Sequence, residues 1–207
     1  MSGRRALIAH RARTSSGPAA GGCHDPTVRR VSVVGNSGSG KTSLARRLAA
    51  ALGVAHVELD AIFHQPGWTE LPAEEFRRRV DERIAADGWV VDGTYSVVRD
   101  LVWAAADTVV WMDLPRRVVM RQIVRRTVVR TALRRELWNG NREPATALFR
   151  LDPRENIVLW SWTRHDHYAR LFAAAAADPA NAHLTFVRVR SRADADRIVT
   201  RAAGGLP

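Results

Sequence analysis

Lysine is almost absent from this sequence of 207 residues. Of its 32 basic side chains, 31 are arginines and the exception is Lys41. With 21 acidic residues, the formal net charge is +11. Such a charge suits two kinds of partner: a nucleic acid or other polyanion attracted non-specifically, or phosphate groups clamped by arginines in a cleft. The charge alone does not separate these two interpretations.

Cysteine and long apolar stretches are also scarce. Cys23 is the only cysteine, so the chain forms no internal disulfide, which favours a reducing, cytoplasmic setting. No run of about 18 apolar residues occurs, which argues against a membrane partner. The apolar content of 46% is typical of a globular protein, and the length favours one folded domain.

Residues 1–27 lack a sustained apolar period and are rich in Gly, Ser, Ala and Arg. We expect a flexible basic tail over 1–27, followed by one folded domain over 28–207. The Arg-rich, acid-poor tail is also similar to an organellar transit peptide. A disordered extension, or a start codon assigned too far upstream, is the simpler interpretation.

From residue 29 onward, short β-branched segments alternate with helical patterns. The expected strands are 31–34, 54–59, 89–91, 107–112 and 183–190, and the main helices are 42–52, 72–86, 115–137, 153–177 and 191–203. This alternation predicts a parallel sheet covered on both faces. The expected fold class is therefore α/β, a three-layer sandwich with a five-stranded parallel sheet and a helical lid over 116–152.

The segment Gly35–Thr42 (GNSGSGKT) matches G-x-x-x-x-G-K-[ST] between the first strand and the first helix. Its glycines allow a tight turn whose N–H groups face an anion. The sole lysine falls inside this motif, which a chance Gly-rich turn does not explain. We predict binding of ATP, or a similar nucleoside triphosphate, with Mg²⁺, by Gly35, Asn36, Ser37, Gly38, Ser39, Gly40, Lys41, Thr42 and Ser43.

Three aspartates follow expected strands, at the sheet edge where ligands of open parallel sheets bind: Asp60, Asp92 and Asp113. We expect Asp92 to join the Thr42 hydroxyl in the magnesium shell. Asp60 is expected at the acceptor or at a magnesium-bound water. Asp113 precedes Leu114–Pro115, where a capping or turn role is the favoured interpretation.

The segment after Asp60, AIFHQPGW, is polar and aromatic. His64 and Trp68 are candidates for an acceptor pocket, and Trp138 is a further loop tryptophan. The alternatives are a turn histidine and tryptophans that only fill the core.

Arginines crowd the helix expected over 115–137. We expect a buried stripe of Met120, Ile123, Val124 and Val128, with most arginines solvated. Two or three are expected to stabilise a transferred phosphoryl group from a closing lid. The eight arginines are Arg116, Arg117, Arg121, Arg125, Arg126, Arg130, Arg134 and Arg135.

Taken together, these stretches resemble the topology modulation proteins, which are adenylate-kinase-like P-loop proteins related to nucleoside-monophosphate, shikimate and gluconate kinases. The resemblance covers about residues 29–192. Its matching segments are GNSGSGKTSLARRLA, VELDAIFHQPGW, GWVVDGTYSVVRDLVW, ADTVVWMDLP, RELWNGNRE and VRVRS.

The resemblance implies a P-loop NTPase fold of the nucleoside-monophosphate-kinase type, with roles for several residues. Asp92–Gly93 resembles the D-G pair that serves magnesium, and Asp60 resembles the aspartate that orients an acceptor hydroxyl. Those kinases continue with F-P-R, whereas this chain has Thr94–Tyr95–Ser96, and its nearest arginine is Arg99. A nucleoside-monophosphate acceptor is therefore less well supported. The implied nucleotide-side and lid arginines are Arg121, Arg125, Arg135 and Arg142.

The sequence thus favours a kinase that moves the γ-phosphoryl of ATP–Mg²⁺ to a small-molecule or nucleotide acceptor. Its expected catalytic residues are Lys41, Asp60, Arg121 and Arg125, and its expected acceptor residues are Asp60, His64, Trp68 and Arg99. A slow ATPase is one alternative. A nucleotide-gated nucleic-acid-binding protein that affects DNA topology is another, although no base-reading motif supports it.

Overall fold

The computed structural model describes the chain except for residues 1–27, 134–135, 143–151, 153–155 and 205–207. The expected basic tail with Cys23 therefore lies outside the described residues, as do Arg135 and part of the expected lid. No helix in the described part of the chain has both the length and the apolar character needed to cross a bilayer.

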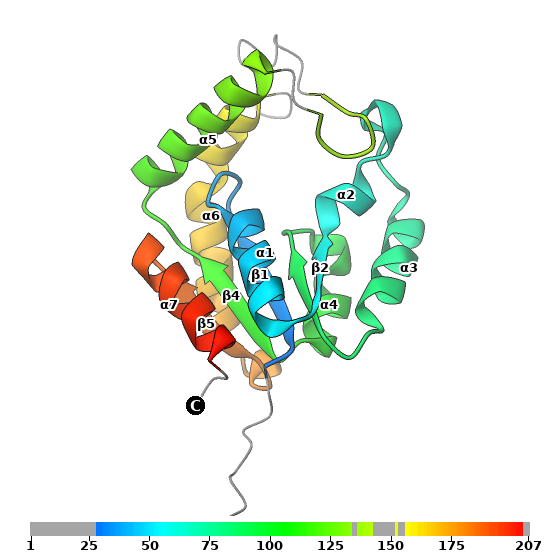
Figure 1. Ribbon diagram of the computed structural model, residues 1–207, viewed down its shortest axis with the longest axis vertical. Coiled ribbons are helices and arrows are strands. Elements are labelled where there is room, and N and C mark those ends of the chain that lie inside the picture. Colours follow the sequence, from blue (N-terminus) through cyan, green and yellow to red (C-terminus); the bar gives the residue numbers. More distant parts are fainter. Residues whose placement is uncertain (1–27, 134–135, 143–151, 153–155, 205–207) are drawn as a thin grey trace, which may run out of the picture.

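Five parallel strands form one sheet in the order β2-β3-β1-β4-β5, which confirms the expected α/β sheet (Figure 1). Central strand β1 pairs with β3 on one side and β4 on the other. In this register Val33 lies opposite Asp92, and Gly35 lies opposite Met112. The carboxyl end of β1 is therefore flanked by the ends of both neighbours. The strands are β1 (Arg30–Gly35), β2 (Ala55–Glu58), β3 (Trp89–Asp92), β4 (Thr108–Met112) and β5 (Thr185–Val189).

Helices cover both faces of the sheet and make three layers (Figure 1). On one face, α1 (Lys41–Leu52), α7 (Arg192–Ala203) and the first half of α5 (Arg116–Ala132) bury Leu44, Leu48 and Val119 against β1 and β4. On the other face, α3 (Ala73–Ile84), α4 (Ser96–Ala105) and α6 (Ile157–Ala177) bury residues such as Phe76 and Phe172. Strands buried on both faces explain why their sequences read as continuous apolar runs.

Two helices were missed by the sequence analysis. Short α2 (Leu59–Phe63) follows β2 directly and leads into a 3₁₀ turn at Pro66–Trp68. α4 lies in SVVRDLVWAA, where Val98 and Val102 are buried at i, i+4 spacing. Three valines and a tryptophan give this ten-residue segment a strand-like composition that masks its helical period.

The predicted buried stripe of the arginine helix was partly wrong. Ile123 is buried as predicted and Met120 is half-buried, but Val124 and Val128 are 43% and 49% exposed. Val119 and Thr127 are buried instead. The helix also ends at Ala132 instead of residue 137. Close packing on the loop after β1 decides which face of α5 is buried. A Cβ built on Gly38 would lie 2.6 Å from the Ile123 Cβ and 3.2 Å from the Val119 carbonyl oxygen.

Candidate active site

The loop between β1 and α1 turns tightly on three glycines. Gly35, Gly38 and Gly40 have φ values of 143°, 82° and 91°, which L side chains rarely adopt. The Ser39 amide donates a hydrogen bond to the Asn36 carbonyl oxygen at 3.2 Å. This conformation is the one expected of a phosphate-binding loop that approaches its ligand with backbone alone.

The first turn of α1 presents its backbone amides without a competing cap. Gly40 occupies the N-cap, no side chain caps the helix, and its first turn holds no acidic residue. The Lys41 Nζ lies over the same loop and donates to the Asn36 carbonyl oxygen at 3.0 Å. Burial lowers the pKa of Lys41, and the charges of Asp92 and Asp60 oppose this shift. A positive helix end and an enclosed ammonium thus meet at one place.

Asp92 ends β3 beside this loop and is only 3% exposed. Burial raises the pKa of Asp92 to about 6, while the Lys41 charge and a hydrogen bond from the Thr42 side chain oppose the shift. Its Oδ1 is buried without a hydrogen-bond partner. An unpaired carboxylate oxygen next to a hydroxyl fits Mg²⁺, which prefers oxygen ligands and keeps several waters. No group of three or more His, Cys, Asp or Glu that could hold a metal ion occurs among the described residues.

Asp60 stands in the first turn of α2, across from Lys41. The Tyr95 hydroxyl donates a hydrogen bond to its Oδ1 at 2.6 Å. The Asp60 charge acts on both Lys41 and Asp92. The structure therefore brings Lys41, Asp60 and Asp92 into one electrostatic group, and the segment after β3 holds Asp60 in orientation.

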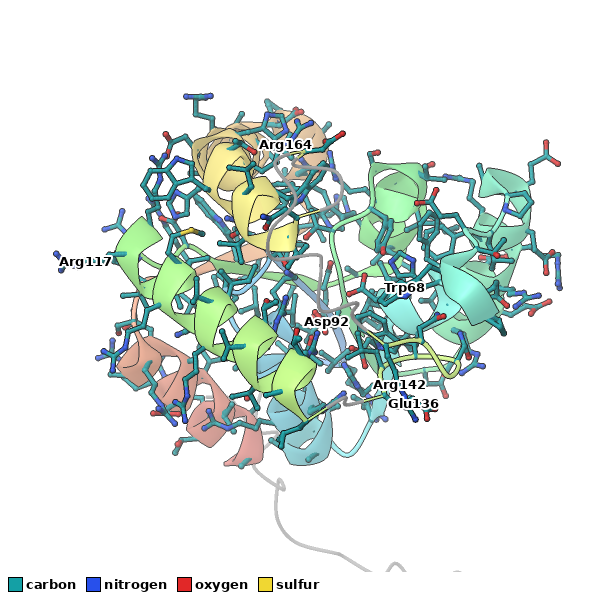
Figure 2. The ribbon with its side chains drawn as sticks, turned by 90° about the horizontal axis from the view of Figure 1, so that it is seen from above. Trp68, Asp92, Arg117, Glu136, Arg142 and Arg164 are labelled. Carbon is teal, nitrogen blue, oxygen red and sulfur yellow. The ribbon has the colours of Figure 1, made fainter. Side chains whose placement is uncertain are left out.

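His64 and Trp68 pack against a distant segment of the chain. The His64 ring stacks on Trp138 with centroids 5.9 Å apart, and it meets Trp68 edge-on at 5.3 Å. The Trp68 Nε1 donates to the Arg142 carbonyl oxygen at 3.2 Å. Trp68, Glu136 and Arg142 lie close together in Figure 2. These rings contact one another, so the acceptor-pocket role predicted for His64 and Trp68 gains no support from this packing.

Two asparagines complete this junction, which we call the amide clasp (residues 136–142 against 61–68). The Asn141 side chain is 4% exposed, accepts from the Trp68 amide at 3.0 Å and donates to the Gln65 carbonyl oxygen at 2.9 Å. The Asn139 Nδ2 donates to the His64 carbonyl oxygen at 2.6 Å. The clasp therefore joins the segment after α5 to the segment that carries Asp60.

One arginine of α5 approaches the loop between β1 and α1 (residues 35–40), which we call the phosphate loop for its predicted role, and it is neither Arg121 nor Arg125. The Arg126 Nη2 lies 3.5 Å from the Ser37 Oγ, and the Arg126 charge acts on Lys41. Arg121 and Arg125, implied by the resemblance near the base and the γ-phosphate, are both exposed.

Arg121 and Arg125 line a groove between α5 and the start of α7. The groove has a volume of about 530 Å³. It adjoins the phosphate loop, because a Cβ on Gly40 would lie 3.9 Å from the Gln122 Oε1. Arg117 points outward from α5, away from Asp92 (Figure 2). The groove is lined by Arg117, Val118, Arg121, Gln122, Arg125 and Arg192.

Buried hydrogen bonds join α6 to the phosphate loop, and no sequence pattern predicts them. The Asn36 Nδ2 donates to the Ser161 carbonyl oxygen at 2.8 Å and to its Oγ at 3.0 Å. The Ser161 Oγ donates to the Ser37 carbonyl oxygen at 2.8 Å. Ser161 is fully buried. Ser161 lies between two tryptophans in a helical stretch, and only the packing of α6 shows that it contacts the phosphate loop.

Two further predictions concern charged residues near the sheet. Arg99 lies on α4 with its Cζ 5.8 Å from the Trp103 ring, and it shares a small cavity with Thr94 and Tyr95. Asp113 does not cap α5, since its Oδ2 instead accepts from the Arg188 guanidinium at 2.6 and 2.8 Å.

Comparison with known proteins finds likeness only among solved structures. No protein-family profile and no curated protein matches this chain. A gluconokinase from Sinorhizobium meliloti 1021 is 21% identical, with 87% of this chain and 92% of that chain covered and a TM-score of 0.47. An unliganded sugar kinase from Janibacter sp. HTCC2649 is 19% identical, with coverage of 86% and 94% and a TM-score of 0.46. Likeness at this level identifies neither a family nor a substrate, and the resemblance to topology modulation proteins stays a prediction.

Proposed function

We propose that this protein is a P-loop kinase that transfers the γ-phosphoryl group of Mg²⁺–ATP to a small acceptor bound beside Asp60. The observation that carries the proposal is the convergence of Lys41, Asp60 and Asp92 at the carboxyl ends of β1, β2 and β3. A buried ammonium and two carboxylates are costly to keep together unless a ligand uses them.

The triphosphate lies on the amides of 36–43, with Lys41 at its β- and γ-phosphates. Thr42 and Asp92 hold Mg²⁺, which neutralises phosphate charge when bound. The nucleoside continues into the groove between α5 and α7, where Arg121 and Arg125 flank it. Guanidinium planes stack well on aromatic bases, so these arginines contact the base side and not the γ-phosphate.

Arg126 stands at the phosphate end and stabilises the charge that develops on the transferred group. The acceptor oxygen attacks the γ-phosphorus, and the bond from that phosphorus to the β–γ bridging oxygen breaks. The proton of the acceptor hydroxyl passes to Asp60, which Tyr95 holds in place. Positioning and electrostatics supply most of the catalysis in such a transfer.

The test is substitution of the single lysine. Lys41→Ala should abolish ATP-dependent phosphorylation and Mg²⁺–ATP binding measured by calorimetry, while circular dichroism stays unchanged. Lys41→Arg should fail as well, since a planar guanidinium does not replace the compact ammonium over the loop. Arg83→Ala, at an exposed position of α3, is the matched control. Full binding and turnover by Lys41→Ala would refute the proposal.

Nucleotide-gated binding of nucleic acid is a second candidate, favoured by the outer arginines of α5. Within Arg116–Ala132 the helix carries no acidic residue. If nucleic acid binds there, its affinity should fall steeply with salt and change on addition of ATP. Affinity for a nucleic acid that resists salt, or that Arg117→Gln with Arg121→Gln leaves unchanged, would remove this candidate.

A further inference from the structure

We propose that Ser161 of α6 is a positioning residue for the phosphate loop. Its hydroxyl holds the peptide between Ser37 and Gly38 so that the Gly38 amide faces the phosphates of the nucleotide. This inference rests on the proposed kinase function, because it assigns a phosphate to that amide. It goes beyond that function by giving α6, which carries no nucleotide-binding motif, a defined part in the site.

Ser161 and the Asn36 side chain form a closed set of hydrogen bonds between α6 and the phosphate loop. The Asn36 Nδ2 donates to the Ser161 carbonyl oxygen at 2.8 Å and to the Ser161 Oγ at 3.0 Å. The Ser161 Oγ donates to the Ser37 carbonyl oxygen at 2.8 Å. The Asn36 Oδ1 accepts from the Ser37 amide at 2.8 Å. Both side chains are buried, so water does not compete for these groups.

The chemistry of the partners fixes the direction of each of these hydrogen bonds. The Ser37 amide can only donate, so the oxygen of the Asn36 side chain must face it. The nitrogen of the same side chain then faces Ser161, whose backbone carbonyl can only accept. The Ser161 hydroxyl accepts from that nitrogen and keeps its own proton for the Ser37 carbonyl oxygen. The opposite orientation of the Asn36 amide would set donor against donor and acceptor against acceptor.

The bond from the Ser161 hydroxyl also sets the direction of the Gly38 amide. In a planar trans peptide the carbonyl and the N–H point in opposite directions. Because the Ser37 carbonyl oxygen is turned toward Ser161, the Gly38 N–H points to the opposite side of the loop. In the described part of the chain the Gly38 amide donates no hydrogen bond. It is therefore available to a phosphate oxygen.

Lys41 lies on that same side of the loop. In the preceding peptide the Ser37 N–H faces the Asn36 side chain, so the Asn36 carbonyl oxygen points away from Ser161. There it accepts from the Lys41 Nζ at 3.0 Å. The ammonium and the Gly38 amide thus both face the side proposed for the β- and γ-phosphates.

The peptide between Ser37 and Gly38 needs such a restraint because it can turn over. The rotation changes ψ of Ser37 and φ of Gly38, and a glycine adopts positive and negative φ values about equally well. Gly38 has a φ of 82° in this structure. In the turned state the Ser37 carbonyl oxygen, and not the Gly38 N–H, would face the phosphate and repel it. The Ser161 hydroxyl lowers the population of this competing state and so raises the affinity for the nucleotide.

Removal of the hydroxyl tests the inference. Ser161→Ala should raise the Kd of Mg²⁺–ATP about tenfold in calorimetry, because the turned peptide becomes populated. The acceptor KM and kcat at saturating ATP should stay within about threefold. Thr163→Ala is the matched control, since the Thr163 Oγ1 bonds to carbonyl oxygens of α6 itself. An unchanged Kd in Ser161→Ala, or an equal loss in Thr163→Ala, would overturn the inference and leave the kinase function intact.

Ser161→Cys serves as a second variant in case the alanine variant does not fold. The thiol fills the space of the hydroxyl but is a weak donor. Under reducing conditions we expect a rise in the Kd of Mg²⁺–ATP similar to that of Ser161→Ala. Wild-type affinity in Ser161→Cys would show that the hydrogen bond to the Ser37 carbonyl oxygen does not position the loop.

A measurement on the ligand-free protein separates this inference from the proposed function. In protein labelled with ¹⁵N-glycine, the Gly38 amide should give one sharp signal in the wild type and a broadened or doubled signal in Ser161→Ala. Gly53, which caps the far end of α1, is the internal reference. Pyrophosphate should shift the Gly38 signal of the wild type.

The outcomes of this measurement do not depend on catalysis. If ATP does not bind or no acceptor is phosphorylated, the kinase proposal fails, while the Gly38 signal still reports the orientation of the peptide. An identical Gly38 signal in the wild type and Ser161→Ala would reject the role of Ser161. No shift with pyrophosphate would reject the Gly38 amide as a phosphate ligand.

Discussion

The proposed nucleotide side and the proposed acceptor side of this site are built in different ways. The proposed nucleotide side consists of consecutive backbone groups at 35–43, with Asp92 one strand away. The proposed acceptor side consists of Asp60 on α2, the Tyr95 hydroxyl that binds it, and the amide clasp beside α2. A site made of contiguous backbone can be read from a motif, whereas a site assembled from distant side chains depends on packing that a motif does not encode.

Arg126 gives the strongest test of this comparison, because it comes from α5, far along the chain, but lies near the proposed nucleotide side. Arg126→Gln should lower kcat about a thousandfold, because arginines at a transferred phosphoryl group contribute on that scale. Arg125→Gln, which changes the groove proposed for the nucleoside, should leave kcat within about threefold because ATP is saturating. Steady-state kinetics with saturating ATP and acceptor measures both. A larger loss for Arg125→Gln would restore the assignment made from sequence.

Substitution of two glycines, one on each side, provides a second test of this difference. Gly38 and Gly67 have φ values of 82° and 71°, but a Cβ at Gly38 would meet Ile123 at 2.6 Å and a Cβ at Gly67 would meet nothing within 4 Å. Gly38→Ala should weaken Mg²⁺–ATP binding about a hundredfold through strain and overpacking. Gly67→Ala should only lower the free energy of unfolding, by about 1 kcal/mol. Calorimetry and urea unfolding measure these effects, and equal ATP affinities would contradict the account of the loop.

The raised pKa of Asp92, about 6, makes magnesium binding depend on pH. Protonation below pH 6 removes the ligand, so the affinity for Mg²⁺–nucleotide should fall about tenfold per pH unit there and level off above pH 7. The nucleotide's phosphates titrate in a similar range, so the measured quantity is the difference from Asp92→Asn, which should lack this component. A parallel pH profile for the two proteins would contradict it.

The same raised pKa has an opposite consequence for the protein without ligand. The folded form binds the Asp92 proton more tightly than the unfolded chain does. The contribution of Asp92 to the free energy of unfolding is therefore present below about pH 4 and is lost as pH rises through about 6.

The amide clasp should give the smallest effect and one limited to the acceptor side. Asn141→Asp replaces a donor to the Gln65 carbonyl oxygen with a carboxylate oxygen, which costs about 1–3 kcal/mol of unfolding free energy. We expect the acceptor KM to rise severalfold with an unchanged ATP affinity, since the segment bearing Asp60 loosens. Glu74→Gln, at an exposed position of α3, is the control. Weakened ATP binding with an unchanged acceptor KM would show that the clasp serves the nucleotide side.

Much of the fold follows from the sequence, because buried strands and turn residues are local signals. The five strands and the glycine loop lie within a few residues of their expected positions. The structure also brings Thr42 and Asp92 together as expected, although their role in binding magnesium stays a prediction.

The rest depends on long-range packing. Periodicity placed Ile123 correctly in the apolar stripe of α5 but also included Val124 and Val128, since valines and arginines are mixed there and several stripes fit equally well. The contact of Ile123 with Gly38 decides which face of α5 is buried, and the two residues are 85 positions apart in the sequence. The link between Asn36 and Ser161 spans 125 residues and has no local pattern at all.

The scarcity of lysine has a chemical consequence. Besides the α-amine of the chain, Lys41 is the one primary amine available to acylating reagents, and it lies enclosed over the phosphate loop. Its lowered pKa leaves more of it in the neutral, nucleophilic form at physiological pH than an ordinary lysine. Acetylation or carbamoylation of this side chain would therefore remove the charge from the loop in a single step, and nucleotide occupancy would protect it.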